Sequence, residues 1–377
     1  MWHCLIILTI FCAACSKKTT QDSSPNFEQS LSCLPNFNDS KGWLGGDVAY
    51  SVLLDPKTSL WFFGDTFIGT ADMDSRKNAI FIANSTAISQ CNSSSGHSSI
   101  YFDWGGKKST LPKAIFNSQN PNSRYWPMDG FTHNKQLYWV LVEVENTGKG
   151  PLDFEFRGVK LAKVSNFEES TDNWKIDFLD LNSEQDFLVG ISIIKQDKHV
   201  IFVTLIDQPK NTNKNRPVIL TRIPLDRLTH PKENLEYLAT DFTWKPGISR
   251  TDAKTLFNNG MTEMSIRYHD SLKKWIAVMH HTKFPSEKIV ISSASEIHGP
   301  WSSWETAYTT PEMLPETPGY DSETFCYAGK EQTQFSDDKN LTITYACNSF
   351  NPDKQRSNLN IYRPKIVQIP LENLKIN

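Results

Sequence analysis

Two aspartates, Asp47 and Asp65, flank an apolar segment that is typical of a β-hairpin. Residues 55–58 (DPKT) suit a tight turn, because proline favours its second position. Antiparallel pairing about this turn places Asp47 nearly opposite Asp65, and opposed residues have Cβ atoms about 4.5–5.5 Å apart. Carboxylates this close repel unless one keeps a proton or a ligand intervenes. Glycines at 45, 46 and 64 allow close approach of backbone or ligand, so we expect the pair to be functional.

Further acidic residues begin later strand-like segments. Asp129 follows Trp126-Pro127-Met128, Glu263 precedes the run 264–268 (MSIRY), and 320–323 (YDSE) opens the last segment pair. Acids at strand ends also bond turn amides, and that structural interpretation stays open for each of them. Paired carboxylates flanking a bond are what glycoside hydrolysis requires, because one donates a proton and the other acts as base or nucleophile.

For this chemistry we assign Asp47 as nucleophile or base and Asp65 as a partner acid, with Asp129 and Glu263 as alternatives for the acid. We expect the substrate to be bound by residues that stand near these acids at the ends of strand-like segments. They are Trp43, Trp126, Tyr320, Asp321 and His280. Tryptophans are also common core residues, and a strand-end role is open for His280.

The elements that must position these residues are strands. Short β-branched and aromatic runs recur between turn residues, while helical periodicity is nearly absent. Pairs of runs cover 48–65, 130–144, 188–206, 264–281 and 323–349, and each is followed by another strand-like segment. Two such segments, LTRIPLDRL (220–228) and IVQIPLENL (366–374), match in chemical type.

Repeats of roughly 50 to 75 residues with three or four strands predict an all-β, five-bladed β-propeller. A β-sandwich is the alternative, and it does not explain the repeated unit. The inner strands of a propeller begin at one common face, so the acids would line one central funnel. We expect one domain over residues 41–377.

Composition excludes several classes of function. The 377 residues include 39 basic and 42 acidic side chains, and the net charge of −3 gives no basis for nucleic-acid binding. The sequence contains no GxSxG, HExxH or GxGxxG motif and no zinc-type cysteine spacing. We therefore expect no cofactor, although a calcium ion on the propeller axis stays open without a motif that encodes it. The carboxylate pair and its neighbouring aromatic residues predict a glycan as the partner, and we expect a monomer.

The N-terminus is typical of an exported chain. Residues Cys4–Ala14 form an apolar run too short to span a bilayer, which needs about 20 residues. Ala13-Ala14-Cys15 resembles the end of a bacterial lipoprotein signal, which predicts that Cys15 is lipidated. Residues 16–40 would then be a flexible tether. The protein would lie in the cell envelope and contact the membrane through this lipid alone. Cleavage after Ala14 with a secreted product is the alternative.

Four cysteines remain after the predicted signal, and an oxidising compartment favours disulfides. Cys326 and Cys347 lie on two strand-like runs joined by a polar turn, so we pair them. Cys33 with Cys91 follows by elimination. Free buried thiols are the alternative.

The stretch GGDVAYSVLLDPKTSLWFFGDTFIG (45–69) also resembles the opening of a bacterial extracellular family long catalogued as of unknown function. WPMDG, GMTEMSIRY and TYACNS resemble its later blocks, so the similarity covers roughly residues 40–374. The resemblance implies a five-bladed propeller akin to arabinanases and fructan-cleaving enzymes, and some members are endo-D-arabinofuranases. It also implies catalytic carboxylates in the first hairpin, at Asp47 and Asp65, and a later general acid, for which Glu263 is the matching residue.

Overall fold

The computed structural model describes residues 33–38, 41–92, 97–107, 111–148, 153–207, 215–318 and 320–376. Strands dominate this part of the chain, and its single α-helix is the short α1 (Pro352–Ser357). None of the helices in the described ranges has the length and apolar character that crossing a membrane requires. The predicted all-β class is confirmed.

The first strands alternate between two sheets. A three-stranded sheet contains, in order, β1 (Trp43–Gly46), β4 (Thr66–Ile68) and β5 (Ile80–Ile82). A four-stranded sheet contains β2 (Tyr50–Asp55), β3 (Thr58–Phe63), β6 (Ser85–Asn92) and β7 (His97–Asp103). The turn between β2 and β3 confirms the prediction for residues 55–58. The predicted first hairpin, however, extends into both sheets, because the chain crosses between them at residues 47–49 and 64–65.

Four antiparallel sheets follow in chain order. The first two consist of β8 (Ser123–His133), β9 (Gln136–Asn146), β10 (Phe154–Val164) and β11 (Ile176–Asn182), then β12 (Phe187–Gln196), β13 (His199–Ile206), β14 (Val218–Pro224), β15 (Glu236–Leu238) and β16 (Trp244–Pro246). The last two consist of β17 (Met264–His269), β18 (Lys274–His280), β19 (Lys288–Ala294) and β20 (Glu305–Thr309), then β21 (Thr324–Glu331), β22 (Asn340–Ser349) and β23 (Lys365–Pro370). Short 3-10 helices are η2 (Thr171–Asn173), η3 (Leu225–Arg227), η4 (Pro311–Met313), η5 (Thr333–Phe335) and η6 (Leu371–Asn373).

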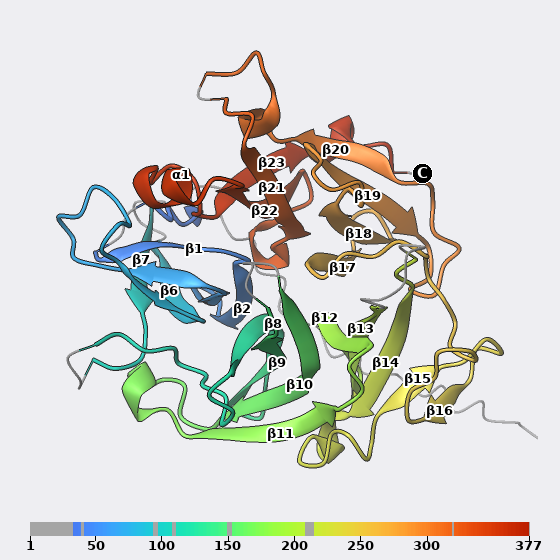
Figure 1. Cartoon of the computed structure of the whole chain (residues 1–377). Coiled ribbons are helices and arrows are strands. Elements are labelled where there is room, and N and C mark those ends of the chain that lie inside the picture. Colours follow the sequence, from blue (N-terminus) through green and yellow to red (C-terminus); the bar gives the residue numbers. More distant parts are fainter. Residues whose placement is uncertain are drawn as a thin grey trace, which may run out of the picture.

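The first strands of successive sheets surround a common centre (Figure 1). β2 contacts β8, β8 contacts β12, β12 contacts β17, and β17 contacts β21. The circle closes where Lys330 of β21 donates a hydrogen bond to the carbonyl of Val48, and where Gln332 donates to the carbonyl of Ala49 at 2.8 Å. The arrangement is propeller-like, with a first strand of each of these sheets facing the centre.

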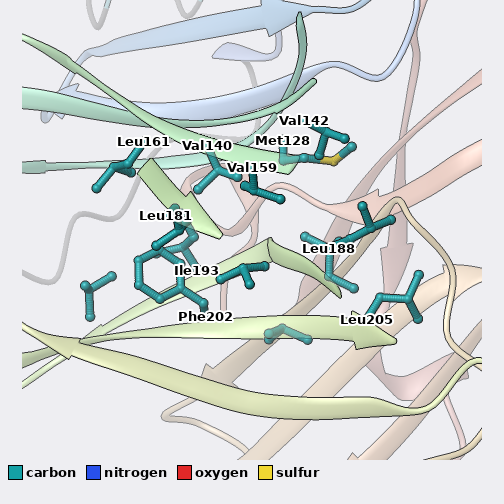
Figure 2. Close-up of a cluster of buried hydrophobic side chains, with 14 of the residues drawn as sticks. Met128, Val140, Val142, Val159, Leu161, Leu181, Leu188, Ile193, Phe202 and Leu205 are labelled. Atoms are coloured by element: carbon teal, nitrogen blue, oxygen red, sulfur yellow. The ribbon is translucent and has the colours of Figure 1, made fainter. Parts of the chain in front are cut away.

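Apolar side chains fill the space between neighbouring sheets. Figure 2 shows one such interface, where Val140 and Val142 of β9 approach Leu188 of β12 and Phe202 of β13. These four side chains are at most 1% exposed. Burying each one stabilises the fold by roughly 1.5–3 kcal/mol. The apolar core therefore lies mainly between neighbouring sheets.

Both predicted disulfides are present. Cys326 and Cys347 are directly paired across β21 and β22, and Cys33 is bonded to Cys91 of β6. Disulfides indicate an extracellular or periplasmic protein. The two matching segments also share one structure, because β14 runs into η3 and β23 runs into η6.

Arg76 joins the small β1–β4–β5 sheet to the C-terminal part of the chain. Its guanidinium is fully buried and donates hydrogen bonds of 2.6–2.8 Å to the carbonyls of Leu44, Gln355, Asn358 and Ile361. Burial, followed by the positive charge of Arg363, lowers the pKa of Arg76 to about 10. Arg76 thus links segments that are up to 285 residues apart in the sequence.

The predicted signal, its lipidated Cys15 and most of the tether over residues 16–40 lie outside the described residues. The described part of that stretch, residues 33–38, is packed against the fold. Phe37 is 3% exposed and lies with its ring edge against Trp61 and Phe63.

Candidate active site

Asp47 and Asp65 lie beside each other where the chain passes between the first two sheets. Asp47 directly follows Gly46 and Asp65 directly precedes Thr66, and these two neighbours are paired across β1 and β4. The backbone N–H of Gly64 donates to the carbonyl of Asp47 at 3.1 Å. A Cβ at position 64 would collide with Oδ1 of Asp47, so this glycine makes room for the carboxylate.

Two tyrosines from the C-terminal part of the chain hold the Asp47 carboxylate. The hydroxyls of Tyr327 in β21 and of Tyr362 donate hydrogen bonds to its Oδ2 at 2.8 and 3.4 Å. Burial, followed by the negative charges of Asp65 and Glu263, raises the pKa of Asp47 to about 8. The tyrosine hydroxyls oppose this shift without cancelling it, so the carboxyl group holds its proton at neutral pH.

Asp65 has a different environment. Its Oδ1 accepts a hydrogen bond from Nε1 of Trp126 at 3.0 Å and lies 3.7 Å from Nε of Arg124. Burial raises the pKa of Asp65 to about 6, while Arg124 and Trp126 act to lower it. The two neighbouring carboxyl groups therefore differ, and Asp65 is the one that carries a negative charge at neutral pH.

Glu263 belongs to the same cluster. It lies just before β17, where its Oε2 accepts a hydrogen bond from the hydroxyl of Thr262 at 2.6 Å. Its charge raises the pKa of Asp47 and that of Tyr327. A third acidic side chain thus acts on the proton of Asp47 through its charge.

A buried lysine supplies a positive charge to this centre. Lys330 of β21 is 1% exposed, donates hydrogen bonds to the carbonyls of Val48 and Ala328, and lies 4.3 Å from the ring centroid of Tyr50. Burial lowers its pKa to about 8, although the charges of the nearby acids, with Glu263 first among them, favour the protonated form. Lys330 balances part of the negative charge that the acids bring together.

The backbone around Asp47 is strained. Val48, Ala49, Ala328 and Tyr362 have φ angles of 71°, 50°, 58° and 57°, a region that L-residues rarely occupy. The conformation is costliest for a β-branched residue such as Val48. Strain of this kind clusters at functional sites, where the surrounding contacts enforce it.

Asp129, which the sequence offered as an alternative acid, is held inside the protein. It is 2% exposed, and its Oδ2 accepts hydrogen bonds of 2.7 Å from the backbone N–H of Ile193 and from Nη2 of Arg267. Its Oδ1 accepts from the N–H of Gly130 at 2.9 Å. Asp129, Arg267 and Lys330 line one small polar cavity between the inner strands. Asp129 is therefore placed to influence the centre through its charge.

Two predictions of substrate contact are corrected by the structure. Trp43 is fully buried, with its ring stacked on Phe102 and its Nε1 bonded to the hydroxyl of Ser85. It is a core residue because β1 is covered on both faces. His280 is 3% exposed and accepts a hydrogen bond from the N–H of Gly329, and burial lowers its pKa to about 3. It is a neutral interior side chain with no access to a ligand at the surface.

The other predicted contact residues lie nearer the surface. Trp126 is partly exposed and bonds Asp65 directly. Tyr320 is 39% exposed. Asp321 forms an ion pair of 2.6 Å with Lys354, which lowers the pKa of its carboxyl group.

Comparison with known protein families gives one match over most of the chain. The family described as "Domain of unknown function (DUF5005)" covers residues 35–371. The chain belongs to this family. Both members of the Asp47–Asp65 pair, together with Glu263, lie within the matched range. Curated proteins give no significant match.

Some solved structures resemble this DUF5005 member at low sequence identity. A protein described as "a putative hydrolase" from Bacteroides ovatus is 17% identical, covers 88% of this chain and 87% of its own, and has a TM-score of 0.68. This value shows a shared fold. A xylan beta-1,4-xylosidase from Bacillus halodurans is 12% identical, covers 87% of this chain and 53% of its own, and has a TM-score of 0.47. An exo-1,5-alpha-L-arabinanase from a bovine ruminal metagenomic library is 11% identical, covers 88% and 95%, and has a TM-score of 0.41.

Four residues of this DUF5005 site escaped the sequence analysis: Tyr327, Tyr362, Arg124 and Lys330. Lys330 carried a weak signal, since it is the only basic residue of β21, where Glu331 directly follows it. Arg124 stands two residues before Trp126, on the same face of β8, so a closer reading of that strand would have found it. The tyrosines carried none, because their contacts with Asp47 span 280 and 315 residues.

Proposed function

We propose that this protein is a glycoside hydrolase that cleaves arabinofuranoside-type polysaccharide, with D-arabinan among its candidate substrates. One observation carries the proposal. Two neighbouring carboxyl groups have pKa values raised to about 8 and about 6, so one is protonated and the other ionised near pH 7. Pairs whose environments separate their pKa values in this way supply the acid and the base of a hydrolytic reaction.

The pKa order reverses the roles expected from the sequence. Asp47 is the general acid, because it keeps its proton and Tyr327 and Tyr362 fix its orientation. Asp65 is the base or nucleophile, because Arg124 and Trp126 favour its ionised form. Glu263 tunes Asp47 through its charge and remains the alternative acid. Each role follows the same rule, that the group with the higher pKa donates the proton.

The sugar class has a separate basis. The segment 45–69, which contains both aspartates, carries the resemblance to a family that includes endo-D-arabinofuranases. We also propose that the sheets beginning with β2, β8, β12, β17 and β21 are the blades of a five-bladed propeller and that the protein acts as a monomer. Export to the cell envelope through a lipid on Cys15 belongs to the same proposal, and the disulfides support an oxidising compartment.

The test is a substrate panel. The mature chain is incubated with plant arabinan, fructan, isolated D-arabinan and mycobacterial arabinogalactan, and released oligosaccharides are measured. We expect products from the arabinofuranoside polymers and none from fructan. A folded sample that releases nothing from any arabinan contradicts the proposal.

A second candidate is a non-catalytic glycan-binding or envelope-assembly propeller. The 3.7 Å approach of Arg124 to Asp65 favours it, because an ion pair of this kind gives the carboxylate a structural role. The same panel separates the two candidates. If wild type binds arabinan but releases no products, and Asp65→Asn binds it with the same affinity, the non-catalytic function is supported.

A further inference from the structure

Three phenylalanines, two of them exposed and one partly buried, pack together at the end of the inner strands where Glu263 and Asp47 lie, and we call them the aromatic row. Phe325 is in β21, Phe350 directly follows β22, and Phe284 is in the connection between β18 and β19. The ring centroids of Phe325 and Phe350 are 4.4 Å apart, and that of Phe284 is 5.3 Å from Phe325. Phe284 and Phe350 are 50% and 53% exposed, so this aromatic row is an apolar surface open to solvent.

The aromatic row is continuous with the candidate active site. Phe325 and Tyr327 are two residues apart in β21, so they lie on one face of the strand, and their ring centroids are 5.7 Å apart. The hydroxyl of Tyr327 donates the 2.8 Å hydrogen bond to Asp47. One tyrosine therefore separates the exposed rings from the carboxyl group that holds the catalytic proton.

Hydrogen-bonding groups border the row on one side. The backbone N–H of Phe350 donates to the carbonyl of Glu323 at 2.9 Å, and the carboxylate of Glu323 pairs with Lys354 at 2.6 Å. Asn351, which precedes α1, donates to the same carboxylate at 3.3 Å. Lys354 and Glu323 have side chains that are 43% and 42% exposed, so their remaining donor and acceptor positions face water.

A sugar chain matches this combination. Each sugar ring presents C–H groups on its faces and hydroxyls at its edges, which suit aromatic rings beside charged hydrogen-bonding groups. Exposed apolar patches with a polar rim mark binding grooves for ligands. The continuity with Asp47 favours, as the occupant, the polysaccharide on which the proposed hydrolase acts.

We propose that Phe284, Phe325 and Phe350 form a subsite that binds sugar residues of the polysaccharide adjacent to the cleaved bond. This inference rests on the proposed hydrolase function. Binding energy from sugars far from the reacting bond can be used to lower the barrier at that bond. The enzyme should therefore prefer long chains over short substrates, and the preference should depend on these rings.

The experiment compares two substrates in the full mature chain. Wild type, Phe350→Ala, Phe284→Ala and the double variant are assayed on arabinan polymer and on 4-nitrophenyl arabinofuranoside. We expect the ratio of kcat/KM for polymer to kcat/KM for the short substrate to fall about tenfold in the double variant. Phe242→Ala is the matched control, because Phe242 is also 53% exposed and lies in the connection between β15 and β16.

A second measurement separates this subsite from the hydrolase proposal. Binding of arabinan oligosaccharides is measured by calorimetry in the Asp47→Asn background, with and without the two phenylalanine substitutions. Weaker binding in the phenylalanine variants supports the subsite even if wild type releases no products, in which case only the hydrolase function fails. The subsite is overturned if the phenylalanine variants keep both the wild-type ratio of kcat/KM values and the wild-type affinity for oligosaccharides. In that case cleavage of arabinan by wild type still supports the hydrolase function. Light scattering tests whether the row instead binds a second copy of the chain. If the phenylalanine variants differ from wild type in oligomeric state while glycan binding is unchanged, the row is an interface between copies and the subsite is also overturned.

Discussion

The hydroxyl of Tyr327 donates a 2.8 Å hydrogen bond to Oδ2 of Asp47, a residue 280 positions earlier in the chain. The bond joins the last sheet to the crossing between the first two. It orients one carboxyl group of the Asp47–Asp65 pair while the other is held by Trp126. The geometry of the candidate acid thus depends on closure of the whole circle of sheets.

Removing either carboxylate should abolish cleavage. We expect Asp47→Asn and Asp65→Asn each to lower kcat on arabinan by at least about 100-fold, because general acid and base catalysis typically contribute that much or more. Reducing-end release measures the effect. Asp270→Asn is the control. The side chain of Asp270 is 78% exposed, and the residue follows β17 at the end opposite to Glu263. Wild-type rates in both active-site variants contradict the assignment.

The pH dependence of kcat/KM should be bell-shaped. Activity requires ionised Asp65 and protonated Asp47, so it rises as pH passes about 6 and falls as pH passes about 8. The limbs report apparent values for the pair, because the two groups interact. Initial rates from pH 4 to pH 10 at low substrate concentration test this.

The acidic limb should respond to Arg124. This arginine lowers the pKa of Asp65, so Arg124→Gln should move the acidic limb to higher pH and leave the alkaline limb in place. Arg250→Gln is the control, because Arg250 pairs with Asp186 in an exposed ion pair. A profile unchanged by Arg124→Gln shows that Asp65 does not set the acidic limb.

Asp47 should destabilise the fold at alkaline pH. Its pKa is raised from 3.8 to about 8 on folding, so the native state binds more protons than the unfolded state between these values. The contribution of Asp47 to stability therefore falls as pH rises through this window. We expect Asp47→Asn to raise the free energy of unfolding by at least about 1 kcal/mol at pH 8, with a smaller effect at pH 4.5. Urea titrations at both pH values measure it, and an equal effect at the two values rules out the raised pKa.

Arg76 should be a main stabiliser of the fold. Arg76→Met leaves the buried carbonyls of Leu44, Gln355, Asn358 and Ile361 without their donor, which we expect to cost about 3 kcal/mol or more. Thermal unfolding measures the loss. Arg250→Met should cost less than about 1 kcal/mol, as is usual for an exposed ion pair. Similar losses in both variants would mean that the four carbonyls find other partners.

Features encoded by neighbouring residues could be predicted from the sequence. The turn at Pro56 and the pairing of Cys326 with Cys347 follow from local residue types, alternation and turn chemistry. The proximity of Asp47 to Asp65 follows from pairing across one short turn, although the intervening chain joins two sheets. Such contacts link residues close in sequence, so local periodicity is enough to reveal them.

The environment of each acid was decided by tertiary structure alone. Nothing in the local pattern distinguishes Trp43, which is fully buried, from Trp126, which bonds Asp65, because burial depends on which sheet covers each strand. The pKa order of Asp47 and Asp65 depends on burial and on charges and hydroxyls brought from later sheets. Residue type and spacing therefore determined that a carboxylate pair exists, and three-dimensional packing decided which member holds the proton.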